Sequence, residues 1–106
     1  MKLITKAIEK KLEKAGYDGD KPICKFFNPC GAATWIIFGR DEENPDILFG
    51  VADLGFGLVE AGTISLSELQ NTKLMFGLGI ERDLHFYPDE ELTLKDFLGL
   101  ESLSRF

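Results

Sequence analysis

The 106-residue sequence has no long hydrophobic run, only two cysteines and a single histidine. No apolar stretch approaches the roughly 18–20 residues of a membrane span. Charges interrupt the N-terminal MKLITKAIEKKLEK at every turn, which excludes a secretory signal, so we expect a cytoplasmic protein without membrane contact. Because the cytosol keeps thiols reduced, Cys24 and Cys30 are expected to be free. These two cysteines and the single histidine, His85, are too few for the usual four-ligand zinc site, so neither a metal nor a cofactor is expected.

Basic residues are scarce after Lys25, where five Lys and Arg face fourteen Asp and Glu, a balance of −9. The first 25 residues carry seven Lys against four acidic residues, and the whole chain has a formal net charge of −6. Nucleic-acid backbones are bound by clustered Lys and Arg, and an acidic chain repels them. Direct nucleic-acid binding is therefore disfavoured. The asymmetry predicts a basic face on an N-terminal helix and an acidic body.

Hydrophobic residues make up 44% of the chain and include nine Phe, which is enough for a packed core and argues against disorder. At this length the sequence predicts a single domain over residues 1–106. Helical spacing comes first and short β-rich runs follow. This order predicts an α+β fold, with an antiparallel sheet of about four strands covered by an N-terminal helix and short helices after the meander. The expected elements are a helix at 2–15; strands at 23–27, 33–40, 47–54 and 58–64; a short helix at 66–72; a packed loop at 73–79; an edge strand at 80–87; and a short helix at 93–99.

Local signals set the two short helices. Ser65 followed three residues later by Glu68 fits a capping box, and Thr93 stands in the same relation to Asp96. The strand at 47–54 is apolar on both sides, so we expect it to be central and covered on both faces.

Two acidic turns are the strongest candidates for a partner-binding surface. Their members are Asp41, Glu42, Glu43 and Asp46 in the first turn, and Asp89, Glu90 and Glu91 in the second. Most runs of like charge are simply solvated turns. The functional alternative is that fixed anionic turns face a basic groove, such as the nucleic-acid channel of a nuclease. Such complementarity speeds association and blocks the natural ligand.

Cys30, His85 and Asp83 are the candidates for a small Cys–His or Asp–His enzyme. Cys30 lies on a turn and would be the nucleophile, and His85 would be the base. Asp83 and His85 are two residues apart and share a face if the segment is a strand. The alternative is that Cys30 is a small buried hydrophobe and His85 ends a strand edge. No spacing brings the thiol and the imidazole together, so we expect no catalysis.

Asp53 interrupts an apolar strand, and a buried carboxylate must be paired or hydrogen-bonded. Arg40 and Arg82 are candidate partners for a buried ion pair, and a cap on the turn before Gly55 is a second structural interpretation. The functional interpretation is an acid with a shifted pKa in a pocket.

Several blocks between about residues 24 and 88 occur together in one order. They are NPCGAATW at 28–35, LFG at 48–50, DLGFG at 53–57, EAGTISL at 60–66 and ERDLHF at 81–86. In this arrangement the chain resembles a family of small acidic proteins of unknown function carried on plasmids, conjugative elements and phages, often near anti-restriction genes. The resemblance implies a bacterial host cell and kinship with an inhibitor of a type II CRISPR nuclease. It supplies no catalytic residues and leaves the N-terminal helix uncovered.

The expected function is that of a mobile-element-encoded counter-defence protein, an anti-CRISPR protein without catalysis. Its expected partner is a host CRISPR effector nuclease, type II favoured, or another basic nucleic-acid-handling protein bound through the acidic turns. The alternatives are the small enzyme above and a plasmid transfer or replication accessory that acts by protein contact. A homo-oligomeric assembly protein is a further alternative, which an exposed apolar patch near Phe76 and Phe106 would favour.

Overall fold

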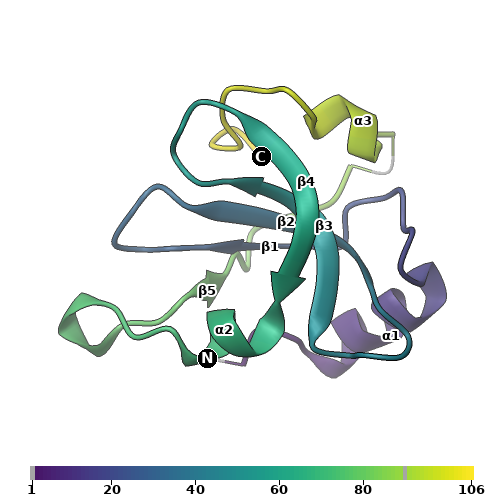
Figure 1. Ribbon diagram of the computed structural model, residues 1–106, viewed down its shortest axis with the longest axis horizontal. Helices are drawn as coiled ribbons and strands as arrows, with labels where there is room; N and C mark the ends of the chain where they lie inside the picture. The colour runs from purple at the N-terminus through teal and green to yellow at the C-terminus, as the bar shows by residue number, and fades with distance from the viewer. Residues whose placement is uncertain (1, 90) are drawn as a thin grey trace.

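The protein is built around one antiparallel sheet with α1 packed against it (Figure 1). The computed structural model describes residues 2–89 and 91–106. Within these residues five strands lie in the order β4-β3-β2-β1-β5. The elements are α1 (Lys6–Ala15), β1 (Cys24–Phe27), β2 (Thr34–Arg40), β3 (Ile47–Asp53), β4 (Val59–Ser65), α2 (Leu66–Asn71), the 3-10 turn η1 (Met75–Gly77), β5 (Glu81–Arg82) and α3 (Leu94–Phe97). The predicted α+β fold is confirmed, with a fifth strand at the edge.

The N-terminal helix begins at Lys6, four residues later than its apolar spacing predicted. Thr5 caps the helix, because its hydroxyl accepts a hydrogen bond from the Ile8 N–H at 3.2 Å. The preceding segment is not helical but is firmly anchored. Leu3 is fully buried, and its carbonyl accepts a hydrogen bond from the Arg82 guanidinium at 3.0 Å. The N-cap at Thr5 therefore divides the predicted helix into a buried non-helical segment before it and α1 after it.

Two apolar cores lie on opposite faces of the sheet. Ile37 packs in the core under α1, whereas its neighbours Ile36 and Phe38 pack in the core under the C-terminal segment. This alternation follows from strand geometry, in which successive side chains point to opposite faces. Leu48 and Val51 divide β3 between the same two cores. The expectation that this strand is covered on both faces is confirmed, although β2 takes the middle of the sheet.

The edge strand expected at 80–87 is only two residues long. β5 pairs with β1, and the Asp83 N–H still donates to the Lys25 carbonyl at 2.9 Å. The Asp83 carboxylate then accepts a hydrogen bond from the His85 N–H at 2.8 Å. Such a side-chain-to-backbone bond two residues on makes a turn. Asp83 therefore ends the strand that the sequence pattern prolonged.

The loop at 73–79 was predicted to be packed, and this is wrong for its tip. Leu74 packs against the core under α1, but Met75 and Phe76 are 67% and 89% exposed. The Leu74 N–H donates to the Leu78 carbonyl at 2.7 Å and closes the loop. A run of apolar residues therefore forms a projecting tip.

The C-terminal segment covers the second core. The Phe97 ring lies 5.6 Å from Phe38 and 4.8 Å from Phe106, measured between ring centroids. Thr93 and Asp96 form the expected capping box of α3. None of the helices in the described part of the chain has the length and hydrophobicity to cross a membrane.

Candidate functional site

The first acidic turn, between β2 and β3, is held in shape by its own aspartates. Asp41 Oδ1 accepts a hydrogen bond from the Glu43 N–H at 2.9 Å. Asp46 accepts one from the Ser65 hydroxyl and one from the Ser67 N–H, both at 2.8 Å. These bonds, that from the Ser65 hydroxyl first, hold the pKa of Asp46 below its ordinary value. Asp41 and Asp46 therefore fix the turn rather than reach out to a partner.

Glu42 and Glu43 project from this fixed turn. Both side chains are exposed, and neither forms an ion pair with a basic side chain in residues 2–89 or 91–106. Hydrogen bonds of Asp41 and Asp46 hold the backbone that carries them, whereas their charges remain open to solvent. The turn is therefore suited to present negative charge.

Helix α1 brings two further carboxylates to this turn. Glu9 and Glu13, one turn apart on the helix, line a groove of about 350 Å³ together with Asp41 and Glu42. Arg40 also lines the groove, but its Nη1 lies 3.1 Å from Glu9 Oε1 and its Nε donates at 2.6 Å to a carbonyl of the same turn. Four carboxylates thus surround one cation that is already paired. We call this feature, together with the exposed Glu43 that follows Glu42 on the same turn, the acidic groove.

Sequence reasoning missed the contribution of α1 to the acidic groove. The spacing of Glu9 and Glu13 places both on one side of a helix, which the sequence shows. Which loop that side meets is set by the packing of α1 across β2. The sequence therefore shows that Glu9 and Glu13 share one side of α1, but it does not show which loop that side faces.

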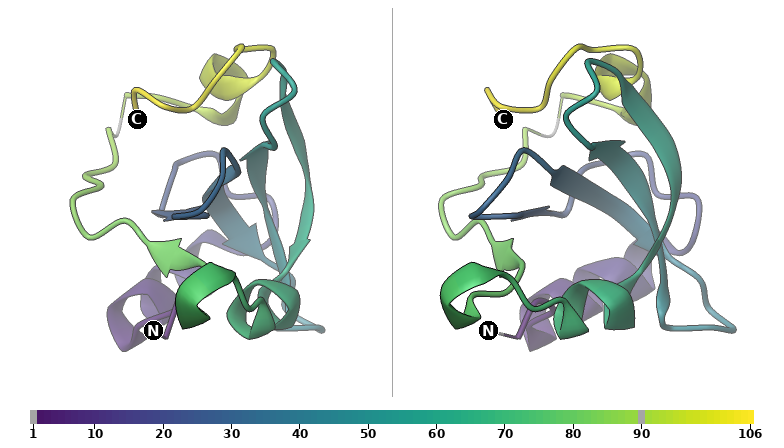
Figure 2. Two further views of the ribbon diagram at one scale, coloured as in Figure 1. Left: turned by 90° about the vertical axis from the view of Figure 1, so that its left-hand side faces the viewer. Right: turned by 60° about the vertical axis from the view of Figure 1, so that its left-hand side comes forward.

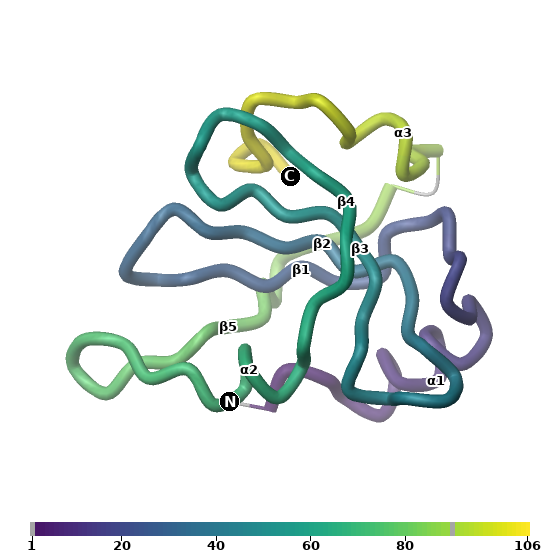
Figure 3. Tube along the Cα trace, in the orientation of Figure 1, coloured from purple at the N-terminus to yellow at the C-terminus, as the bar shows by residue number. Residues whose placement is uncertain are grey.

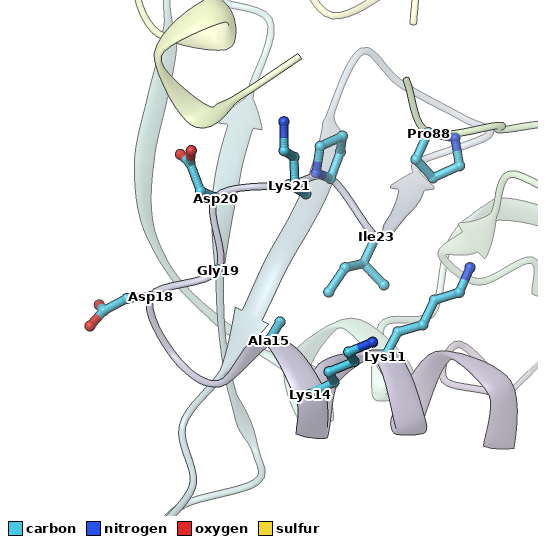
Figure 4. A pocket seen from close by; sticks show the side chains of 10 residues that line it. Lys11, Lys14, Ala15, Asp18, Gly19, Asp20, Lys21, Ile23 and Pro88 are labelled. Carbon is cyan, nitrogen blue, oxygen red and sulfur yellow. The ribbon is translucent and has the colours of Figure 1, made fainter. Parts of the chain in front are cut away.

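The other flank of α1 is basic. Lys11 and Lys14 line a hollow of about 700 Å³ between α1 and the loop before β1. Figure 4 shows both side chains rising beside Ile23, while the carboxylates of Asp18 and Asp20 turn away. The predicted basic helix is therefore only half right. α1 presents lysines to one loop and carboxylates to another.

The second acidic turn lies away from the acidic groove. Asp89 lines a hollow together with Phe97 of α3. The β2–β3 turn lies beside α1, on the opposite side of the sheet from α3 in Figure 1. Asp89 Oδ1 accepts a hydrogen bond from the Glu91 N–H at 2.9 Å. Glu90 lies outside the described residues. The two predicted acidic turns are thus separate surfaces, and the acidic groove combines carboxylates from a helix and a turn.

Asp53 contacts neither of the arginines considered for it in the described structure. Its Oδ2 accepts a hydrogen bond from the Leu103 N–H at 3.0 Å, and its Oδ1 accepts one from the Gly55 N–H at 2.9 Å. Burial by itself raises the pKa of Asp53, but the bonds from Leu103, Gly55 and Ser102 outweigh it and hold this pKa below its ordinary value. Asp53 therefore ties the C-terminal segment to the end of β3.

The candidate nucleophile Cys30 and the candidate base His85 are not brought together. Cys30 and His85 are both exposed, and no hydrogen bond in the described ranges joins them. The Asp83 carboxylate bonds to the backbone of His85, and its Oδ2 lies 3.5 Å from Lys25 Nζ. Cys30 is not the buried hydrophobe of the non-catalytic alternative. Among the described residues, no three His, Cys, Asp or Glu side chains gather as metal ligands.

Both cysteines are free, as expected, but their environments differ sharply. Burial raises the pKa of the Cys24 thiol to about 12, against the opposing pull of Arg82 and Lys11. We therefore expect a thiol-specific chromogenic disulfide reagent at about pH 8 to label one thiol rapidly, that of Cys30. The second should react only after unfolding. Cys30→Ser should abolish the fast reaction, and two fast equivalents in the native protein would contradict this prediction.

The molecule is thus a small acidic α+β protein whose charges are sorted onto separate faces. It belongs to the family described as "Protein of unknown function (DUF2958)", which matches residues 1–98. The match includes α1, so the N-terminal helix is part of the family, contrary to the narrower resemblance over residues 24–88. No curated protein and no solved structure matches the chain.

Proposed function

We propose that the protein acts by contact as a counter-defence inhibitor, presenting the acidic groove to a basic surface of a CRISPR-type nuclease, type II favoured. The observation that carries the proposal is the convergence of four carboxylates around the already paired Arg40. The resemblance to small proteins of mobile elements supports the choice of partner. Bound there, the protein excludes the nucleic acid that the basic surface serves.

The charge of the groove suits this role for an electrostatic reason. Negative potential that is fixed in space steers a basic partner into register and raises the association rate. The hydrogen bonds of Asp41 and Asp46 fix the turn before the partner arrives. The turn therefore loses little conformational freedom when the partner binds, which favours binding.

The test mixes the purified protein with a type II nuclease and its guide RNA, and measures DNA cleavage and co-elution on a sizing column. Glu42→Lys/Glu43→Lys should weaken inhibition by at least about tenfold, because like charges then face each other. The wild-type complex should weaken as salt rises, because the pairs are solvent-accessible. No co-elution and unchanged cleavage at molar excess would remove the proposal.

A matched control separates the acidic groove from net charge alone. Asp20→Lys/Glu60→Lys makes the same change in formal charge at two exposed positions outside the groove. This control should inhibit nearly as well as the wild type. Glu91→Lys, which makes half that change in charge, tests the second acidic turn. Equal losses in the two double variants would mean that overall charge, not the groove, governs binding.

The alternative partner is a basic protein of plasmid transfer or replication, which the same groove fits. The two proposals then differ only in the partner, because both use the same groove residues and both predict the same salt dependence. Mass-spectrometric identification after a pull-down distinguishes the two. Glu42→Lys/Glu43→Lys serves as the negative bait. A protein is accepted as a partner only if the wild-type bait captures it and this variant does not.

A further inference from the structure

Two loops of the chain share one short pattern whose central phenylalanine lies outside both cores. Residues 54–58 read LGFGL and residues 74–78 read LMFGL. In both loops the phenylalanine is almost fully exposed, 88% for Phe56 and 89% for Phe76. Single exposed apolar residues are common on protein surfaces and need no explanation. Here each exposed phenylalanine has exposed Leu or Met neighbours, so each tip is a cluster of apolar side chains. The tips need an explanation outside the monomer's cores.

The backbone holds these rings outward. Each phenylalanine precedes a glycine in the left-handed region, with φ of 85° at Gly57 and 72° at Gly77. Phe76 itself has φ 60°, which is unfavourable for a residue with a bulky side chain. Local strain of this kind persists only where the surroundings impose it, and it marks functional segments. Here the strained conformation points an apolar ring into solvent.

Both tips project from the same end of the molecule. Figures 1 and 3 show them at the left, with the tip of the β1–β2 hairpin between them, and Figure 2 shows all three facing the viewer after the turn. A hollow of about 580 Å³ opens beside the 54–58 tip. Small residues, Gly31, Ala32, Gly55 and Gly57 among them, form most of its wall, and Asp53 and Glu101 add two carboxylates. Projecting rings and a hollow walled by small side chains thus occupy one face.

A face with both projections and a hollow can complement itself. In a two-fold dimer the same patch is used twice, so a projection of each copy must find a depression on the other. Each ring carries roughly 150–250 Å² of surface. With the exposed Leu and Met side chains beside them, the two tips approach the roughly 800 Å² per partner of a standard interface.

We propose that this face docks onto a second copy of the chain, with the Phe56 and Phe76 tips as its apolar anchors. The occupant is a second copy because the hollow lies on the same surface as the rings. A bilayer would leave the hollow unfilled, and the chain's net charge of −6 repels an anionic membrane. The acidic groove lies at the other end of the molecule, so a dimer leaves it open (Figure 1). The inference therefore stands independently of the proposed function.

Sedimentation velocity at protein concentrations from about 1 μM to about 1 mM should show a shift from monomer toward dimer. Phe56→Ser and Phe76→Ser should each raise the dimer dissociation constant about 30-fold, the effect of losing an interface hot spot. Tyr87→Ser is the matched control, because Tyr87 is 84% exposed but lies outside both tips. It should leave the dimer unchanged.

Two further readouts separate an interface from a structural role. Dimerisation should tighten as salt rises from about 10 mM to about 1 M, because screening weakens the repulsion between like-charged copies. Phe76→Gly should weaken the dimer yet raise the melting temperature of the monomer by about 4 °C, because glycine accepts the left-handed backbone. A monomer at every concentration would overturn the proposal. So would a dimer that persists in Phe56→Ser/Phe76→Ser, or binding of the same tips to phosphatidylcholine vesicles without self-association.

Discussion

Gly50→Ala is expected to lower the free energy of unfolding by about 3 kcal/mol, whereas Gly62→Ala should not lower it. Gly50 lies within β3, paired with Ile37 on one side and with Gly62 of β4 on the other. A Cβ atom on Gly50 would lie 2.1 Å from the Ile36 carbonyl oxygen. That oxygen belongs to the backbone of β2 and has no rotamer to change, so the two strands must separate. The cost should therefore reach the upper end of the range for overpacked cores.

Gly62 is the natural control because it is the direct partner of Gly50 across the sheet. Apart from its chain neighbours, no heavy atom of the described chain lies within 4 Å of the position of a Cβ atom on Gly62. Alanine there should stabilise the protein by about 0.5–1 kcal/mol, because glycine loses more conformational freedom on folding. Urea unfolding of both variants gives the comparison. Equal effects would mean that the tight approach of β2 to β3 is not a constraint in the folded protein.

The parts of the fold that sequence reasoning predicted well depend on neighbours in the chain. Ser65 accepts a hydrogen bond from the Glu68 N–H as its capping signal indicated, and Thr93 and Asp96 form their predicted box. Such bonds join residues three apart, so the sequence contains the whole interaction. The strands of the meander follow for the same reason, from alternation and the turns between them.

The sequence-based predictions that were wrong concern segments whose structure depends on contacts with residues far away in the chain. Apolar letters at 74–78 predicted packing, but the closure of the loop by Leu74 and Leu78 turns Phe76 outward. The candidate site shows the same division. The sequence picked out Glu42 and Glu43, and the structure leaves them exposed, whereas Glu9 joins them only because α1 crosses β2. Periodicity specifies a face, and only packing specifies what that face meets.

Asp53→Ala is expected to lower the free energy of unfolding by about 3 kcal/mol and to loosen the C-terminal segment. Asp53 is only 6% exposed, and its two oxygens accept the N–H groups of Leu103 and Gly55. Leu103 is fully buried, so its N–H loses its acceptor where water does not replace it. A hydrogen bond to a charged group is worth about 1.5–3 kcal/mol, and a buried donor left unpaired adds a penalty. Amide exchange at Leu103 should accelerate together with the loss of stability.

The same carboxylate predicts a pH dependence whose sign is fixed. Its pKa in the folded protein lies below the ordinary value of 3.8, so the unfolded chain binds the proton more tightly. The stabilisation from Asp53 is thus fully present above the ordinary pKa and is lost as pH falls through the lower, folded-state pKa. Unfolding measured between about pH 7 and pH 2 should show this acid loss, and Asp53→Asn should reduce it.

Asp46→Asn is the control that separates the specific role of Asp53 in holding the C-terminal segment from a general effect of removing a carboxylate. Asp46 also has a lowered pKa, but it is partly exposed, and its carboxylate joins the β2–β3 turn to Ser65 and Ser67 at the start of α2. Its variant should keep Leu103 protected from exchange, because water can replace the lost bonds at the surface. If Asp53→Asn leaves both the acid limb of the stability curve and the Leu103 amide unchanged, the C-terminal segment is held by the packing of Phe97 and Phe106 alone. The hydrogen bonds of Asp53 would then follow from that packing and not cause it.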